Sequence, residues 1–261
     1  MNDRMMQQFL KIPSSEIEWL EISKKFEAPH ALGAIDGKHV RVQKPKNAGS
    51  FYYNYKHTHS TILMAIAGPV NDSGIWNRSS LLQGIQDSSI KLPKDEDLPN
   101  GEIAPYVFLG VDAFALKTFM MKPFPQKDLT GEKRVYNYRQ SRAKRISENL
   151  FGILSNRWWV FFTIINLEPK YVEDIILTSL ILHNFFIIST ISSNFYRPLL
   201  FADTVFEDGE VSEGEWRRAD PCNSFYPLQT PRFGHNSSQS AKSVREKFMK
   251  YFVTDGAVEW Q

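Results

Sequence analysis

The stretch from Ala31 to Gln43, ALGAIDGKHVRVQ, decides how this chain folds. Its first five residues are apolar or glycine, whereas His39 to Gln43 alternate between polar and apolar side chains, as in a strand with one buried face. Gly37 allows a bend between the two halves. The stretch therefore predicts a strand pair or one kinked strand, with Asp36 in the middle of a sheet.

Further strands and helices are expected on both sides of this stretch. Apolar runs predict a second strand within 51–68, buried on both faces, and a third strand at 106–110. Helical spacing and N-cap signals predict helices at 14–26, 73–82, 113–121, 141–158 and 171–191, with an irregular basic loop over 123–137. Strands and helices are therefore interspersed along the chain.

The composition favours a globular protein of a reducing compartment. The 261 residues are 42% hydrophobic, enough for one sizeable core, and the lone Cys222 cannot form an intramolecular disulfide. The N-terminal residues lack the clean apolar core of a signal peptide. Ile175 to Ile191 carry no charged residue, but they are at the lower limit for a membrane span and include His183 and Asn184, so we expect a buried helix and no membrane partner.

Three acidic residues on separate expected elements are candidates for chemistry. Asp36 interrupts the first strand stretch, Asp112 follows the third strand, and Glu148 lies on the long helix with 35 residues between it and Asp112. Carboxylates that converge from separate elements are what Mg²⁺-dependent phosphodiester chemistry needs. Asp72 is a secondary candidate, although a role as helix N-cap explains it without chemistry.

The basic residues are unevenly distributed, although the formal net charge is only +2. Arg139, Arg142 and Arg145 recur every three residues on the helix with Glu148, and such a stripe could follow a DNA backbone. The alternative is a solvated helix face on which Arg145 pairs with Glu148. Lys38 is a further candidate DNA contact, although a strand-edge lysine that prevents aggregation has the same sequence signature.

A series of motifs in this order resembles the Harbinger transposase-derived nuclease family. The match runs from about Glu16 to about Ile188. Its blocks are GAIDGKHV (33–40), NDSGI (71–75), FLGVDAF (108–114), YNYR (136–139), SR (141–142), ENLFGIL (148–154) and LHN (182–184).

The resemblance implies an α/β, ribonuclease H-like fold, in which a mixed sheet is flanked by helices. It implies that Asp36, Asp112 and Glu148 hold a two-metal site of Mg²⁺ or Mn²⁺ for DNA cleavage and joining, and that the protein is nuclear, with the cytoplasm as a second compartment. The family's N-terminal helical DNA-binding region is at most vestigial here, so a separate DNA-binding protein is a candidate partner besides DNA. We expect a helical remnant at 1–28, a nuclease-like domain at 29–191, and at 192–261 an acidic, partly disordered tail with a terminal amphipathic segment.

Two departures from the family pattern predict impaired catalysis. If Gly110 and Phe114 are aligned with the family, the usual aspartate position holds Val111, and Asp112 would face the other side of the strand unless the strand end bends. Relatives also have a strand between the 62–68 run and Asp72 that is missing here, so the sheet is expected to lack one edge strand.

The sequence therefore supports two alternative functions. The first is a metal-dependent DNA endonuclease-like protein. The alternative is a catalytically inactive, domesticated transposase that serves as a DNA- or protein-binding scaffold.

Overall fold

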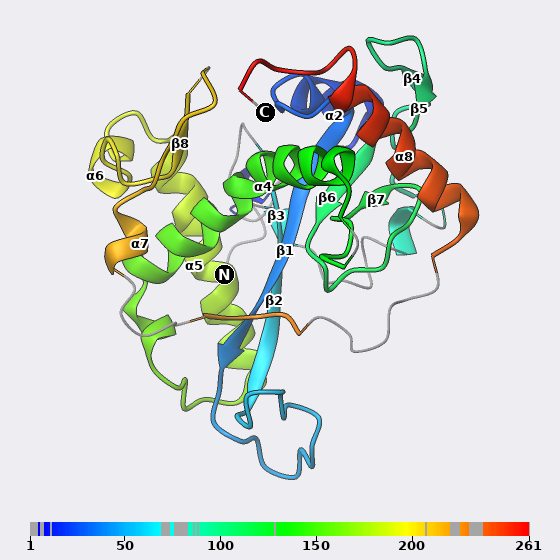
Figure 1. The fold of residues 1–261 in the computed structure, drawn as a ribbon. Helices are drawn as coiled ribbons and strands as arrows, with labels where there is room; N and C mark the ends of the chain where they lie inside the picture. Colours follow the sequence, from blue (N-terminus) through cyan, green and yellow to red (C-terminus); the bar gives the residue numbers. More distant parts are fainter. Residues whose placement is uncertain are drawn as a thin grey trace.

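A mixed six-stranded sheet lies at the centre of the molecule (Figure 1). The computed structural model describes residues 5, 8–10, 12–68, 74–75, 83–85, 87, 89–127, 129–206, 208–219, 225–229 and 237–260. The strand order is β3-β2-β1-β6-β7, and β10 also pairs with β1. The strands are β1 (Ala31–Arg41), β2 (Ser60–Ala67), β3 (Gly74–Ile75), β6 (Val107–Gly110), β7 (Met120–Met121) and β10 (Phe225–Pro227).

The central strand β1 has different neighbours along its two halves. It pairs antiparallel with β2 from Ala34 to Arg41, while its first half pairs in parallel with β6 as far as Ile35. Beyond the end of β6, β10 pairs antiparallel with Lys38 to Val40. The predicted strand pair is therefore one continuous strand, and Asp36 lies between the segments paired with β6 and with β10.

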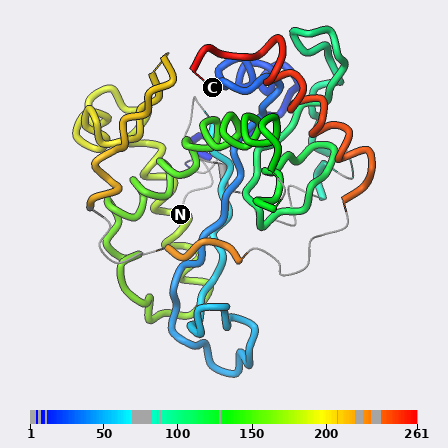
Figure 2. The backbone as a smooth tube through the Cα atoms, in the orientation of Figure 1, coloured from blue at the N-terminus to red at the C-terminus, as the bar shows by residue number. Residues whose placement is uncertain are grey.

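Helices flank the sheet, as expected of a mixed α/β fold. Figures 1 and 2 show α4 running across the sheet, with α8 beside its N-terminal half. The arrangement is consistent with a ribonuclease H-like fold, which confirms the expected fold class. The helices are α2 (Glu16–Ser23), α4 (Gly131–Arg157), the 3-10 helix η1 (Trp159–Phe162), α5 (Pro169–Ile188), α6 (Ser193–Tyr196), α7 (Trp216–Ala219) and α8 (Gln239–Val253). Two small hairpins pair β4 (Glu96–Asp97) with β5 (Ile103–Ala104) and β8 (Thr204–Val205) with β9 (Val211–Ser212).

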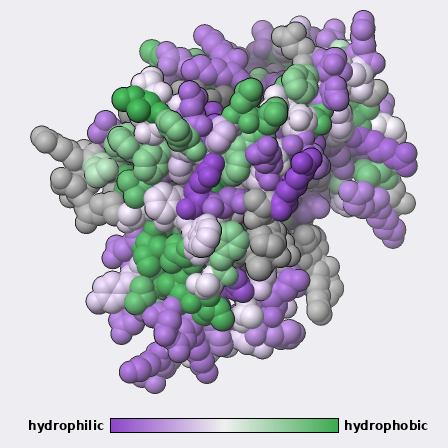
Figure 3. All heavy atoms as spheres, turned by 90° about the vertical axis from the view of Figure 1, so that its left-hand side faces the viewer, coloured by the Kyte–Doolittle hydropathy of each residue, from purple (hydrophilic) through white to green (hydrophobic). Residues whose placement is uncertain are grey.

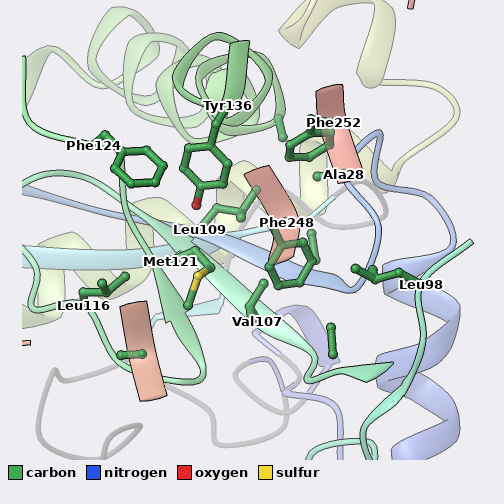
Figure 4. Packing of buried hydrophobic residues seen from close by; sticks show 14 residues of the cluster. Ala28, Leu98, Val107, Leu109, Leu116, Met121, Phe124, Tyr136, Phe248 and Phe252 are labelled. Carbon is green, nitrogen blue, oxygen red and sulfur yellow. The ribbon is translucent and has the colours of Figure 1, made fainter. Parts of the chain in front are cut away.

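The core between the sheet and the helices α4 and α8 is apolar and closely packed. Figure 4 shows Tyr136 of α4 pointing towards the side chains of β6 and β7, with Phe248 and Phe252 of α8 beside it. Phe252 is 3% exposed, and its ring centroid lies 6.1 Å from that of Tyr136. Burial of such aromatic side chains is a large favourable term in folding, and α8 therefore belongs to the core of the protein.

The apolar helix α5 is a core helix on one side only. It is long and apolar enough to cross a membrane by length and composition, but Val172 and Leu180 pack in the core and Asn184 donates a hydrogen bond of 2.6 Å to the carbonyl of Phe9. These contacts support the predicted buried helix. The helix also exposes apolar side chains such as Phe185 and Ile188, and Figure 3 shows further apolar side chains on the face of the molecule that carries α6.

Three sequence-based element predictions are wrong in the described residues. α4 begins at Gly131 after the N-cap Thr130, so residues 131–137 of the loop predicted over 123–137 are helical. The helix predicted at 113–121 is replaced by a turn and by β7, which pairs with β6. Gly74 and Ile75 form β3, which pairs with β2 at the edge of the sheet, where a helix was predicted. The edge at which a strand was expected to be missing therefore holds a strand of two residues.

The described part of the segment 192–261 is folded onto the rest of the protein. Its elements α6, β8, β9, α7, β10 and α8 include a strand of the central sheet and a helix of the core. Sequence reasoning that emphasised acidity and missing periodicity did not anticipate this. The proposed three-part domain division stays a prediction.

Candidate active site

The three carboxylates predicted from the sequence line one cavity. Asp36 comes from β1, Asp112 from the turn after β6, and Glu148 from the middle of α4, and the cavity has a volume of about 430 Å³. Ile35 and Gly110 are register partners in the parallel pair of β1 and β6, so Asp36 and Asp112 follow the same end of that pair. The fold thus brings together residues that are far apart in the sequence.

Asp36 is buried and already has polar partners. Its side chain is 5% exposed, Oδ1 accepts a 2.7 Å hydrogen bond from the backbone N–H of Gly37, and Oδ2 lies 2.8 Å from Nζ of Lys38. Lys38 Nζ also lies 5.4 Å from the ring centroid of Phe151. A buried carboxylate needs such partners because desolvation of its charge is costly.

A bend after β6 removes the strand geometry on which the expected orientation of Asp112 depended. β6 ends at Gly110, and the N–H of Phe114 donates to the carbonyl of Val111 at 3.0 Å, so alternation along a strand no longer applies. Both Val111 and Asp112 line the cavity. Lys122 Nζ lies 3.8 Å from Asp112 Oδ1 and donates to the carbonyl of Asp112 at 3.0 Å.

Glu148 is held by an arginine that the sequence analysis did not single out. Arg217 of α7 donates a hydrogen bond of 2.9 Å to Glu148 Oε2 and binds both carboxylate oxygens of Asp203. The hydrogen bond with Asp203 and that with Glu148 raise the pKa of Arg217, although burial acts against them. The guanidinium therefore stays charged beside Glu148.

A second missed cation, Lys144, also lines the cavity. Burial lowers the pKa of Lys144, while the negative charges of Asp36 and Glu148 act in the opposite direction. The sequence does contain a signal for this residue, because Lys144 precedes Glu148 by four residues and such residues share one helix face. No comparable local signal exists for Arg217.

The predicted solvent-facing arginine stripe on α4 is not formed. Arg142 is 4% exposed, donates hydrogen bonds to the carbonyls of Gly209 and Phe206, and pairs with Glu27. Arg139 donates to the carbonyl of Gly256 at 3.1 Å. Both guanidinium groups therefore support packing of the C-terminal region in this structure.

Arg145 does not pair with Glu148 as the alternative reading proposed. Its Nη1 lies 3.6 Å from Oδ2 of Asp203 instead. Direct DNA contacts of Lys38, Arg139, Arg142 and Arg145 stay predictions, and Asp72 lies outside the described residues.

The cavity does not fit a divalent metal ion in this arrangement. Within the described ranges, no group of three or more His, Cys, Asp or Glu side chains is placed to hold a metal. Asp36 and Glu148 each have a basic side chain within 3 Å, at 2.8 Å for Lys38 and 2.9 Å for Arg217. Metal ligation requires carboxylate oxygens to face one point together, and here they face cations of the protein itself.

Comparison with known proteins identifies the family. A family model described as DDE superfamily endonuclease matches residues 35–184, which contain Asp36, Asp112 and Glu148. No curated protein and no solved structure matches the chain. The match spans more than half of the chain and covers β2, β6, α4 and most of β1 and α5. The chain therefore belongs to the DDE superfamily endonuclease family.

Proposed function

We propose that this protein is a Harbinger-type, transposase-derived endonuclease that acts on DNA in the nucleus, with Asp36, Asp112 and Glu148 as its catalytic carboxylates. The observation that carries the proposal is the shared cavity, into which β1, the turn after β6 and α4 each contribute one of these residues. The reaction class is phosphodiester hydrolysis or strand transfer. A separate DNA-binding protein is a candidate partner in this role.

The cations at the cavity suit a DNA substrate. Lys38 and Lys144 line it beside the carboxylates, and phosphate groups of DNA bind lysine side chains with release of counterions. DDE-type nucleases use Mg²⁺ or Mn²⁺, which we propose as cofactors only for an arrangement in which the carboxylates are freed from their present partners. We therefore derive no catalytic step through a metal from this geometry.

A catalytically inactive scaffold is the second candidate function. The pairing of Glu148 with Arg217 and of Asp36 with Lys38 favours it, because these ion pairs satisfy the carboxylates without metal. In this role the protein would bind DNA or a protein partner, and binding would be unaffected by chelators.

Nicking of supercoiled plasmid distinguishes the two functions. We expect the wild-type protein to nick DNA with Mg²⁺ or Mn²⁺, and Asp36→Asn and Glu148→Gln to abolish nicking. Glu173→Gln, which changes an exposed carboxylate of α5 outside the cavity, is the matched control and should cut like wild type. Nicking that survives both cavity substitutions would refute the catalytic assignment. Chelator-insensitive, salt-sensitive DNA binding without cleavage would support the scaffold.

A further inference from the structure

The C-terminal part of the chain, beyond the segment matched by the family, forms one wall of the carboxylate cavity. Trp216 and Arg217 of α7 line it, and so do Phe225, Pro227 and the neighbouring Leu228. The family match ends at residue 184. This wall therefore comes from residues outside the matched nuclease segment.

Arg217 links the wall to the predicted catalytic residue Glu148. Its Nη2 donates to Glu148 at 2.9 Å, and its Nε donates to Oδ1 of Asp203 at 2.9 Å. The Asp203 side chain is fully buried and also accepts a hydrogen bond of 2.8 Å from the N–H of Gly214. Burial alone would raise the pKa of Asp203, but these hydrogen bonds and the charges of Arg217 and Arg145 lower it. Asp203 therefore stays ionised and positions Arg217.

Contacts along one face of α4 dock α7 next to Glu148. The indole N–H of Trp216 donates to Asn149 Oδ1 at 2.9 Å, and Asn156 donates to the carbonyl of Trp216 at 3.2 Å. The Trp216 ring lies directly on Gly152, where an added Cβ would overlap it. A helix position without a side chain lets the ring approach this closely.

β10 covers the part of the site that β1 forms. It pairs with Lys38, His39 and Val40, two to four residues after Asp36. Figures 1 and 2 show this segment, in orange, crossing the strand. Leu228 lies so close to Gly37 that an added Cβ there would be 2.7 Å from its Cδ1. The C-terminal region thus contacts both Asp36's strand and Glu148.

We propose that Arg217 is a built-in lock on the nuclease site: its guanidinium occupies the Glu148 carboxylate and excludes a divalent cation until α7 moves away. A metal ion at Glu148 would share the carboxylate with Arg217, which binds Oε2, and two positive charges at one carboxylate repel each other. This inference rests on the proposed function, because it assigns Glu148 to metal binding. It also accounts for the poor fit of the cavity to a metal.

The test is a Mn²⁺ titration of the full-length protein, with free Mn²⁺ followed by electron paramagnetic resonance. We expect Arg217→Gln to bind Mn²⁺ at least tenfold more tightly than wild type. Arg218→Gln, which changes the exposed neighbouring arginine of α7, is the matched control and should bind like wild type. The double substitution Arg217→Gln with Glu148→Gln should lose the gain. Equal Mn²⁺ affinity of wild type and Arg217→Gln, whether tight or undetectable, would overturn the lock.

A second variant covers the case in which Arg217→Gln does not fold. Trp216→Ala removes the ring that docks α7 on Gly152 but leaves the Asp203–Arg217 pair, and we expect an intermediate gain in Mn²⁺ affinity. No gain in folded Trp216→Ala would then overturn the proposal.

Failure of the lock and failure of the proposed function give different results. If Arg217→Gln gains Mn²⁺ affinity without nicking DNA, the lock stands and the nuclease function fails. If wild type nicks DNA with Mn²⁺ and Arg217→Gln has neither higher affinity nor faster nicking, the function stands and the lock fails.

Discussion

His183 shows how a single buried side chain makes stability depend on pH. It is fully buried in α5, and its Nδ1 lies 2.8 Å from the hydroxyl of Tyr196. Burial lowers the pKa of His183 to about 3, with a smaller contribution from the charge of Arg197. His183 is therefore a hydrogen-bonded core histidine.

The sign of the pH effect follows from the lowered pKa. The unfolded chain binds a proton at His183 below pH 6.5, and the folded protein does not until about pH 3, so stability is lost as the pH falls through this window. We expect His183 to account for a loss of about 2 kcal/mol between pH 7.5 and pH 5. Urea denaturation at both pH values should show this part of the loss in wild type and in His59→Gln but not in His183→Gln. Equal losses in all three proteins would contradict it.

Gly152 is a second residue with a defined packing role. We expect Gly152→Ala to lower the free energy of unfolding by about 1–3 kcal/mol, because the new methyl group would push Trp216 off α4. The loss should occur even though alanine favours helices over glycine. Gly131→Ala is the control, since no atom of the described residues, apart from its chain neighbours and its own helix backbone, lies within 4 Å of its Cβ position. Thermal denaturation of both variants tests the difference, and a neutral Gly152→Ala would contradict the observed packing.

At the scale of elements, the helices and strands that could be predicted are those that depend on local sequence pattern. The three central strand runs and the helices α2 and α5 follow from apolar periodicity and from capping residues such as Ser15. The first ten residues of α4 were missed because Tyr136 is buried by α8, a partner more than a hundred residues away. β7 was missed because two residues become a strand only through pairing with β6.

The same distinction holds for the site. Asp36, Asp112 and Glu148 could be proposed from motif order, and the cavity does contain them. Arg217 could not be proposed, because its position beside Glu148 depends on contacts of α7 with α4 and with buried Asp203. Long-range partners of this kind leave no periodic signal in the sequence.

The helix α8 gives an element-scale prediction. We expect Phe252→Ala to destabilise the protein by about 3–5 kcal/mol, because it removes a buried aromatic ring between α4 and α8. Lys242→Ala on the exposed side of the same helix should change stability by less than about 0.5 kcal/mol. Chemical denaturation measures both. Similar values for the two variants would mean that α8 is not a core helix in solution.

At the scale of the whole molecule, the matched nuclease segment and the C-terminal region share one core. One apolar cluster joins Ala28, Val107, Tyr136 and Phe248, which come from four parts of the chain. Elements that share a core unfold together. We therefore expect a single cooperative transition in calorimetry, with equal calorimetric and van't Hoff enthalpies, and Phe252→Ala should shift the whole transition. Two transitions, of which Phe252→Ala moves only one, would indicate separate units.

The divided pairing of β1 also sets an order for events during protein synthesis. Residues 38–40 obtain their β10 neighbour only from residues 225–227. At the usual speed of translation, this partner leaves the ribosome roughly ten to forty seconds after the strand that it completes. A newly made chain thus carries a strand edge next to Asp36 without its β10 partner until residues 225–227 have left the ribosome, and β10 covers that edge beside the acidic site only after this point.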